Sequence, residues 1–90
     1  MTLARRYIVR GTVQGVGYRF FTCTCADALG IRGWVKNLPD GTVEVHAEGD
    51  EEQLKEFEFD LSRGARYARV SGVDSRDVET GSHSDFKIRR

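Results

Sequence analysis

The stretch "GTVQGVGYRF" at residues 11–20 places three glycines, a glutamine and an arginine directly after an apolar run. Residues 5–13, which run into the start of this stretch, alternate between apolar and polar side chains, which is typical of a half-buried strand. Residues 19–29 carry apolar side chains at helical spacing, and Gly30 follows where a helix commonly ends. The stretch therefore predicts a strand, a tight glycine-rich turn and a helix of about three turns.

The predicted helix has one apolar face and contains both cysteines of the chain. That face is expected to consist of Phe21, Cys25, Ala28 and Leu29. Cys23 and Cys25 point to different sides of a helix, so we expect no disulfide between them. The pair lacks the further ligands of a structural zinc site, and His46 and His83 are distant in the sequence. We therefore predict neither a metal site nor a cofactor.

A hairpin and two further strands are predicted in the rest of the chain. Residues 31–36 and 43–48 both alternate, and the turn "NLPDG" joins them through a Pro-Asp-Gly sequence that favours chain reversal. Short apolar alternation returns in residues 65–79. The closing "DFKIRR" at 85–90 carries two apolar residues of one parity, which leaves a short last strand open.

Residues 49–64 form the clearest helical pattern. Asp50 is followed three residues later by Gln53, which resembles a capping box, and acidic residues fill the first turn. The apolar face consists of Leu54, Phe57 and Leu61. The order of elements is then β-α-β-β-α-β, with that possible fifth strand. This is the ferredoxin-like α+β sandwich, in which two helices cover one face of a mainly antiparallel sheet. We expect a single domain over residues 1–90.

The charge balance of the chain excludes several classes of partner. Fourteen basic and fourteen acidic residues cancel among the 90 residues, so no overall field draws the chain to nucleic acid or to an anionic membrane. No apolar stretch approaches the length of a membrane-spanning helix, and the N-terminus lacks the pattern of a signal peptide. We expect a cytoplasmic monomer in which any anion site is local.

The glycine-rich turn has the features of such a local anion site. A strand that enters a glycine-rich turn and then a helix presents several backbone N–H groups to one point, where the helix dipole adds positive potential. Arg19 stands in the first helical turn, where a cation opposes the dipole unless an anion offsets it. Its guanidinium can bind two phosphate oxygens while loop amides bind the others. An ordinary tight turn beside an exposed arginine is the other interpretation.

Two common nucleotide-binding motifs are absent from this turn. The dinucleotide fingerprint requires a third glycine three residues after Gly17, where Phe20 stands. A P-loop requires Gly-Lys-Ser/Thr, which the stretch does not contain. The sequence therefore does not support nucleotide binding at this turn.

Three spaced motifs resemble those of the acylphosphatase family. They are "GTVQGVGYR" at 11–19, "GWVKN" at 33–37 and "DGTV" at 40–43, and with the closing "FKIR" the resemblance covers nearly the whole chain. It implies a metal-free enzyme that hydrolyses small-molecule acyl phosphates to a carboxylate and inorganic phosphate. The catalytic residues that it implies are Arg19, which binds the phosphate, and Asn37, which orients the attacking water. The implied amide cradle comprises Gln14, Gly15, Val16, Gly17, Tyr18 and Arg19.

One departure from the family pattern lies next to the implied site. Family members often have a small hydroxyl residue directly after the asparagine, whereas Leu38 follows here, so a side-chain hydrogen bond from that position is lost. We expect this change to affect rate and substrate preference more than activity. From the topology we expect Asn37, at the end of its strand, to lie beside the glycine-rich loop.

The alternative function is a non-catalytic regulatory module that binds a small anion on the same fold. RNA recognition is improbable, because RNA-binding domains of this topology need aromatic residues on a central strand that here reads "TVEVHAE". We expect the aromatic residues Phe20, Phe21 and Trp34 to belong to the core rather than to a ligand site.

Overall fold

Strands and helices follow one another along the chain in the predicted order. The structure, a computed structural model, describes residues 1–90. Its elements are β1 (Leu3–Thr12), α1 (Tyr18–Leu29), β2 (Arg32–Asn37), β3 (Val43–Gly49), α2 (Glu51–Arg63), β4 (Arg69–Val78) and β5 (Phe86–Arg89). The short last strand that the sequence left open is therefore present as β5.

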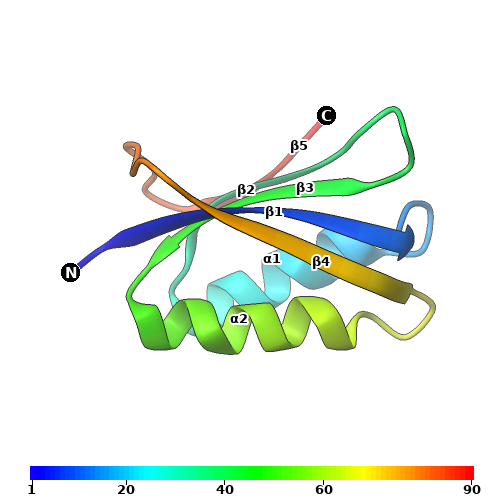
Figure 1. The fold of residues 1–90 in the computed structure, drawn as a ribbon, viewed down its shortest axis with the longest axis horizontal. Coiled ribbons are helices and arrows are strands. Elements are labelled where there is room, and N and C mark those ends of the chain that lie inside the picture. The colour runs from blue at the N-terminus through cyan, green and yellow to red at the C-terminus, as the bar shows by residue number, and fades with distance from the viewer.

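The strands form one sheet in the order β4-β1-β3-β2-β5. All neighbouring strands are antiparallel except β2 and β5, which are parallel. Both helices lie on the same face of this sheet, with α1 against β2 and β5 and α2 against β4, β1 and β3 (Figure 1). The prediction of a ferredoxin-like α+β fold with a mainly antiparallel sheet is confirmed.

The core fills the layer between the sheet and the two helices. Strand residues of one parity face the helices, because successive side chains of a strand point to opposite sides. The fully buried residues of this layer include Tyr7, Val9, Val35, Val43, Val45, Leu54, Phe57 and Leu61. The ring of Phe57 packs edge-on against Tyr7 and Phe86, at centroid distances of 6.1 and 6.0 Å. The predicted apolar face of α2 is confirmed.

The buried face of α1 differs from the prediction. Its centre consists of Tyr18, Thr22 and Ala26, which follow one another at four-residue spacing. Thr22 is tolerated there because its hydroxyl donates a hydrogen bond of 2.8 Å to the carbonyl of Tyr18. The predicted residues lie at the edge of the core or outside it, with Phe21, Cys25 and Leu29 partly buried and Ala28 exposed.

The capping signals that the sequence suggested for the helices are present. The carboxylate of Asp50 accepts a hydrogen bond from the amide of Gln53, and the Gln53 side chain accepts one from the amide of Asp50, both at 2.8 Å. Gly30 ends α1 in a left-handed conformation with φ of 74°. These local signals fix the helix bounds and therefore the points at which the strands begin.

A bulge at Gly11 directs the chain from β1 into the glycine-rich loop. The pairing of β1 with β4 shifts register between Arg10 and Gly11, where φ is +128°. A Cβ atom at Gly11 would lie 2.0 Å from the carbonyl oxygen of Arg69, so only glycine fits this position. The bulge therefore sets the direction in which the loop leaves the sheet.

Trp34 is buried on the sheet face that the helices leave open. The guanidinium carbons of Arg6 and Arg89 lie 4.9 and 4.8 Å from its ring centre, and the residue is 7% exposed. Its predicted burial is confirmed, but arginines rather than core residues cover the ring.

Candidate functional site

The residues that the sequence singled out meet at one end of the sheet. Arg19, Asn37 and the loop residues Gly15 and Gly17 line the same cleft, whose volume is about 190 Å³. The cleft is completed by Val13, Tyr18, Phe20 and Ile88. In Figure 1 the loop after β1 and the turn between β2 and β3 both lie at the right-hand end of the sheet. The expected neighbourhood of Asn37 and the loop is therefore present.

The loop glycines adopt backbone conformations that expose amide groups. Gly15 and Gly17 have φ of 73° and 79°, in the left-handed region that side chains disfavour. Phe21 donates the first helical hydrogen bond, to the carbonyl of Gly17 at 3.0 Å. The amides of residues 18–20 come before it and have no backbone partner. No side chain caps the helix and no acid occupies its first turn, which leaves the positive end of α1 open to an anion.

Arg19 adds a cation to this end of the helix. Its Nη1 donates a hydrogen bond of 3.3 Å to the carbonyl of Arg89, and the protein contains no ion pair that includes it. A guanidinium beside unpaired amides and a helix N-terminus raises the local positive potential. The arrangement can bind a dianion such as a phosphoryl group.

Asn37 supplies a neutral polar side chain to the same cleft. Its Oδ1 is buried and makes no hydrogen bond, and it is the only buried side-chain polar atom of the protein without a partner. An unpaired buried acceptor costs free energy, so its presence at a cleft indicates a role in binding. The oxygen can accept a hydrogen bond from a bound water or substrate group.

Gln14 fixes the position of Asn37 relative to the loop. Its Nε2 donates hydrogen bonds of 2.8 Å to the carbonyls of both Leu38 and Thr42, in the turn that follows Asn37. Gln14 and Val16, which the sequence placed in the amide cradle, do not line the cleft. Both bonds of the Gln14 side chain go to backbone oxygens, so the leucine at position 38 does not disturb them.

Tyr18 contributes to the cleft through its backbone. The side chain is buried, and its hydroxyl donates a hydrogen bond of 2.8 Å to the carbonyl of Leu61. Burial raises the pKa of the phenol well above its ordinary value, so the hydroxyl stays protonated and structural. The ring therefore holds the start of α1 against α2 while the amide remains free.

Phe20 does not belong to the core, contrary to the prediction. The residue is 72% exposed and lines the cleft beside Arg19. Side chains in a helix lean towards its N-terminus, and here the neighbouring loop contains glycines that offer no side chain to cover the ring. Phe21, one position later, packs against Tyr18 with ring centres 5.8 Å apart.

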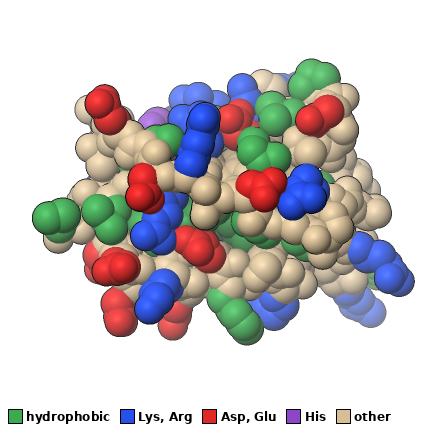
Figure 2. All heavy atoms as spheres, viewed as in Figure 1, with side chains coloured by type: hydrophobic (Ala, Val, Ile, Leu, Met, Phe, Trp, Pro, Cys, Tyr) green, Lys and Arg blue, Asp and Glu red, His purple; other side chains and the backbone are tan.

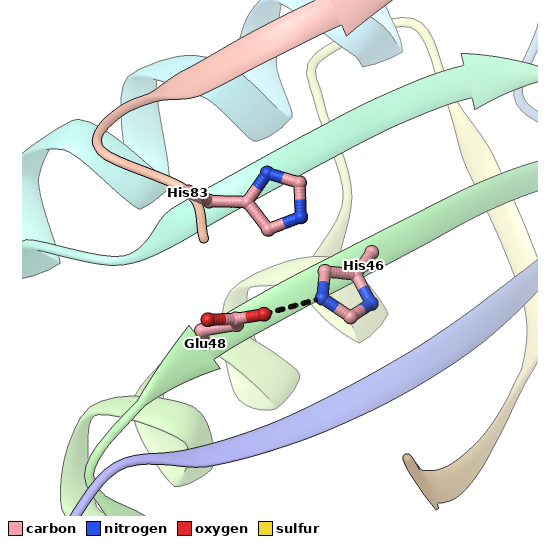
Figure 3. Close-up of side chains that lie close together, drawn as sticks. All are labelled: His46, Glu48 and His83. Atoms are coloured by element: carbon pink, nitrogen blue, oxygen red, sulfur yellow. Dashed lines mark hydrogen bonds and ion pairs between the residues drawn. The ribbon is translucent and has the colours of Figure 1, made fainter. Parts of the chain in front are cut away.

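A second polar cluster lies at the other end of the sheet, on its open face (Figure 3). It consists of His46 and Glu48 on β3 and His83 in the connection from β4 to β5, and their ligand atoms all lie within 4.8 Å of one another. His46 Nε2 and Glu48 Oε2 are 2.7 Å apart, and the amide of Gly81 donates to the same oxygen at 2.6 Å. No local sequence pattern predicts this cluster, because its histidines are 37 positions apart.

The hydrogen bonds of His46 indicate that this cluster has a structural role and is not a metal centre. The Arg6 guanidinium can only donate hydrogen bonds, and its Nε lies 3.4 Å from His46 Nδ1, so Nδ1 is the acceptor. The ring proton is then on Nε2, which donates a hydrogen bond to Glu48 Oε2. A metal on Nε2 would displace that proton and leave a guanidinium facing the other ring nitrogen. Histidine ligands of metals instead donate their second nitrogen to an acceptor. The cluster therefore fits a role in holding residues 79–85 over β3.

Charges elsewhere on the surface are mixed. Basic and acidic side chains are interspersed over the face shown in Figure 2. None of the helices combines the length and the apolar character needed to cross a membrane. The positive potential of the cleft is thus a local property of the loop and Arg19.

Comparisons with known proteins agree with the geometry of the cleft. The family model for acylphosphatase matches residues 5–88. An acylphosphatase of Methanothrix thermoacetophila is 47% identical over 88 residues, which cover 98% of each chain. The crystal structure of acylphosphatase from Bacillus subtilis superposes with a TM-score of 0.95 at 38% identity, covering 98% of this chain and 99% of that one. The structure of an acylphosphatase from Coxiella burnetii gives 0.94 at 34% identity, covering 98% and 93%. The chain belongs to the acylphosphatase family, whose members are enzymes that hydrolyse acyl phosphates.

Proposed function

We propose that this chain hydrolyses the carboxyl-phosphate bond of acyl phosphates by direct attack of water on phosphorus. In this mechanism Arg19 and the loop amides bind the phosphoryl oxygens, and Asn37 orients the water. The observation that carries the proposal is the set of unpaired groups in one cleft. Arg19 has no carboxylate partner, the amides of residues 18–20 have no backbone partner, and Asn37 Oδ1 has no partner of any kind.

The chemistry of the substrate matches what the cleft contains. A carboxylate is a good leaving group, so it departs without being protonated by the enzyme. Phosphoryl transfer through a loose transition state mainly requires positioning and stabilisation of charge on the phosphoryl oxygens. None of the residues that line the cleft is a histidine, aspartate or glutamate, so no general acid or base adjoins the phosphate.

The proposed step balances without a cofactor. The oxygen of water bonds to phosphorus as the bond from phosphorus to the acyl oxygen breaks, and the electron pair leaves with the carboxylate. The proton of the water passes to a phosphoryl oxygen of the substrate. Asn37 can hold the water because it both donates and accepts hydrogen bonds, and it carries no charge that would neutralise the phosphate.

The test is the disappearance of benzoyl phosphate with the purified protein in excess EDTA, beside an Arg19→Ala variant and a phosphomonoester control. Hydrolysis of the anhydride only, insensitive to EDTA and lost in the variant, is expected. Folded protein that binds inorganic phosphate but does not accelerate hydrolysis would contradict the proposal. It would favour the alternative of a small-anion-binding regulatory module.

We also propose that residues 1–90 act as one cytoplasmic domain and as a monomer. One core extends from β1 to β5, and a single copy supplies every residue of the cleft. Both cysteines are free thiols, as is usual in a reducing compartment. Elution as a single species of about 10 kDa in gel filtration is expected from the mass of 10.2 kDa.

A further inference from the structure

The cleft contains more than a place for the phosphate. Large apolar residues that remain exposed are few in this protein: Met1, Phe20, Phe59, Tyr67 and Ile88. Two of these, Phe20 and Ile88, line the cleft with Arg19 and Asn37. Exposed apolar side chains beside a polar site commonly mark a binding surface.

Phe20 and Ile88 come from different elements and are brought together by packing. Phe20 lies in the first turn of α1, directly after Arg19, and Ile88 lies on β5, which packs against α1. Phe20 is 72% exposed and Ile88 is 45% exposed, so both retain apolar surface that a ligand can cover. Neither side chain is needed to fill the core, where Phe86 supplies the buried aromatic residue of β5.

The electrostatics of the cleft restrict what can cover this surface. Arg19 is the only charged residue among those that line it. Once the phosphoryl group occupies Arg19 and the helix N-terminus, no second cation remains for an anionic acyl group and no carboxylate remains for a cationic one. An uncharged apolar acyl group is the chemistry that the remaining wall accommodates.

We infer that Phe20 and Ile88 form an acyl-binding subsite that favours acyl phosphates with aromatic or branched apolar acyl groups over acetyl phosphate. This inference rests on the proposed function, because it requires the phosphate to lie against Arg19. Phe20 and Ile88 then determine specificity, because they contact the apolar part of the leaving carboxylate while Arg19 and the loop amides bind the phosphoryl group.

The test compares the hydrolysis of benzoyl phosphate and acetyl phosphate by wild-type protein and by Phe20→Ala, Ile88→Ala and the double variant. Phe20→Ala is expected to lower kcat/KM for benzoyl phosphate by about three- to tenfold, mainly through KM, because an aromatic contact that is present in both ground and transition states is lost. Acetyl phosphate, whose acyl group offers only one methyl group to the ring, is expected to be affected less. The double variant should lose the preference for benzoyl phosphate.

Phe59→Ala is the matched control, since it removes an equally exposed phenylalanine, at 67% exposure, from α2. It should leave both substrates unchanged, and thermal melts of all variants should coincide because these side chains lie outside the core. An equal loss on both substrates in Phe20→Ala would overturn the subsite and indicate an effect on the loop. So would a benzoyl preference that survives in the double variant.

The two proposals fail in different ways. If the wild-type protein hydrolyses acetyl phosphate but shows no preference for benzoyl phosphate, the subsite is wrong and the proposed function stands. If the folded wild-type protein hydrolyses neither, the proposed function is wrong and the subsite falls with it.

Discussion

The two ends of the sheet differ in whether their polar side chains have hydrogen-bond partners. At the end with the cluster of His46, Glu48 and His83, the Glu48 carboxylate receives hydrogen bonds from His46 and from the amide of Gly81, and the surroundings are buried. At the end with the cleft, Arg19 has no acidic partner and Asn37 Oδ1 has no partner. Satisfied polar groups stabilise a fold, whereas unsatisfied ones are kept for a ligand. We call the end with the histidine cluster the structural end, and the end with the proposed active site the functional end.

The largest expected effect comes from removing the cation of the functional end. Arg19→Ala should lower kcat/KM by at least about 10²–10³-fold, as for the loss of other preorganised contacts to a transition-state anion. Arg19→Lys should retain only part of the wild-type kcat/KM, because the point charge of lysine cannot bind two phosphoryl oxygens at once as a guanidinium does. The free energy of unfolding should not fall in either variant, since a cation at a helix N-terminus is unfavourable.

The control for this pair is Arg66→Ala, which removes an exposed arginine that does not line the cleft. Its kinetics should match those of the wild-type protein. Full activity of Arg19→Ala would mean that the phosphate binds elsewhere. The assignment of the active site to this end of the sheet would then be wrong.

A smaller effect is expected from Asn37→Ala. It should lower kcat by about 10²-fold while competitive inhibition by inorganic phosphate stays close to that of the wild-type protein, because in the proposed mechanism the asparagine orients water and Arg19 binds the anion. The melting temperature should not fall, because the oxygen that is removed has no hydrogen bond. If phosphate inhibition weakened together with kcat, Asn37 would be part of the phosphate site and its assigned role would be wrong.

The opposite result is expected at the structural end. Glu48→Gln should lower the free energy of unfolding by about 1–3 kcal/mol, because a buried carboxylate with two donors is replaced by a neutral amide. It should leave kcat/KM unchanged. Glu79→Gln serves as the matched control in urea unfolding, because Glu79 is an exposed glutamate in the connection from β4 to β5. A loss of activity in Glu48→Gln at a temperature where it remains folded would show that the two ends are coupled.

The pH dependence of this stabilisation has a definite sign. Burial raises the pKa of Glu48, but hydrogen bonds from His46 and Gly81 outweigh it, and the net pKa lies below the ordinary value of 4.5. The unfolded chain then binds more protons, so this contribution is full above pH 4.5 and is lost as pH falls through the folded pKa. Wild-type protein should therefore lose stability on acidification more steeply than Glu48→Gln, and parallel curves would contradict the assignment.

Most of the fold could be predicted because its signals are local. The capping box of Asp50 and Gln53, the helix end at Gly30 and the alternation in the strands each depend on a few neighbouring residues. The face of α1 was predicted less well, because Thr22 satisfies its hydroxyl within the helix and occupies a core position that apolar periodicity assigns to others.

The candidate site also contains some features that local sequence predicts and others that depend on tertiary structure. Arg19 and the loop glycines could be found from the sequence, since glycine at positive φ and a cation in a first helical turn are local patterns. The bridge from Gln14 to the hairpin turn could not, because it depends on β1 and β2 both pairing with β3. The meeting of His46 with His83 depends likewise on neighbours from distant segments.

The two hydrogen bonds of Gln14 affect which sequence changes the hairpin turn can tolerate. One side-chain nitrogen reaches the carbonyls of Leu38 and Thr42, and every residue type offers a carbonyl. Substitutions within the turn can therefore accumulate without loosening Asn37 from the loop, as the leucine at position 38 illustrates. An inserted residue would separate the two carbonyls that one nitrogen now reaches. The Gln14 bridge therefore constrains the spacing of these two carbonyls and not the side chain at position 38.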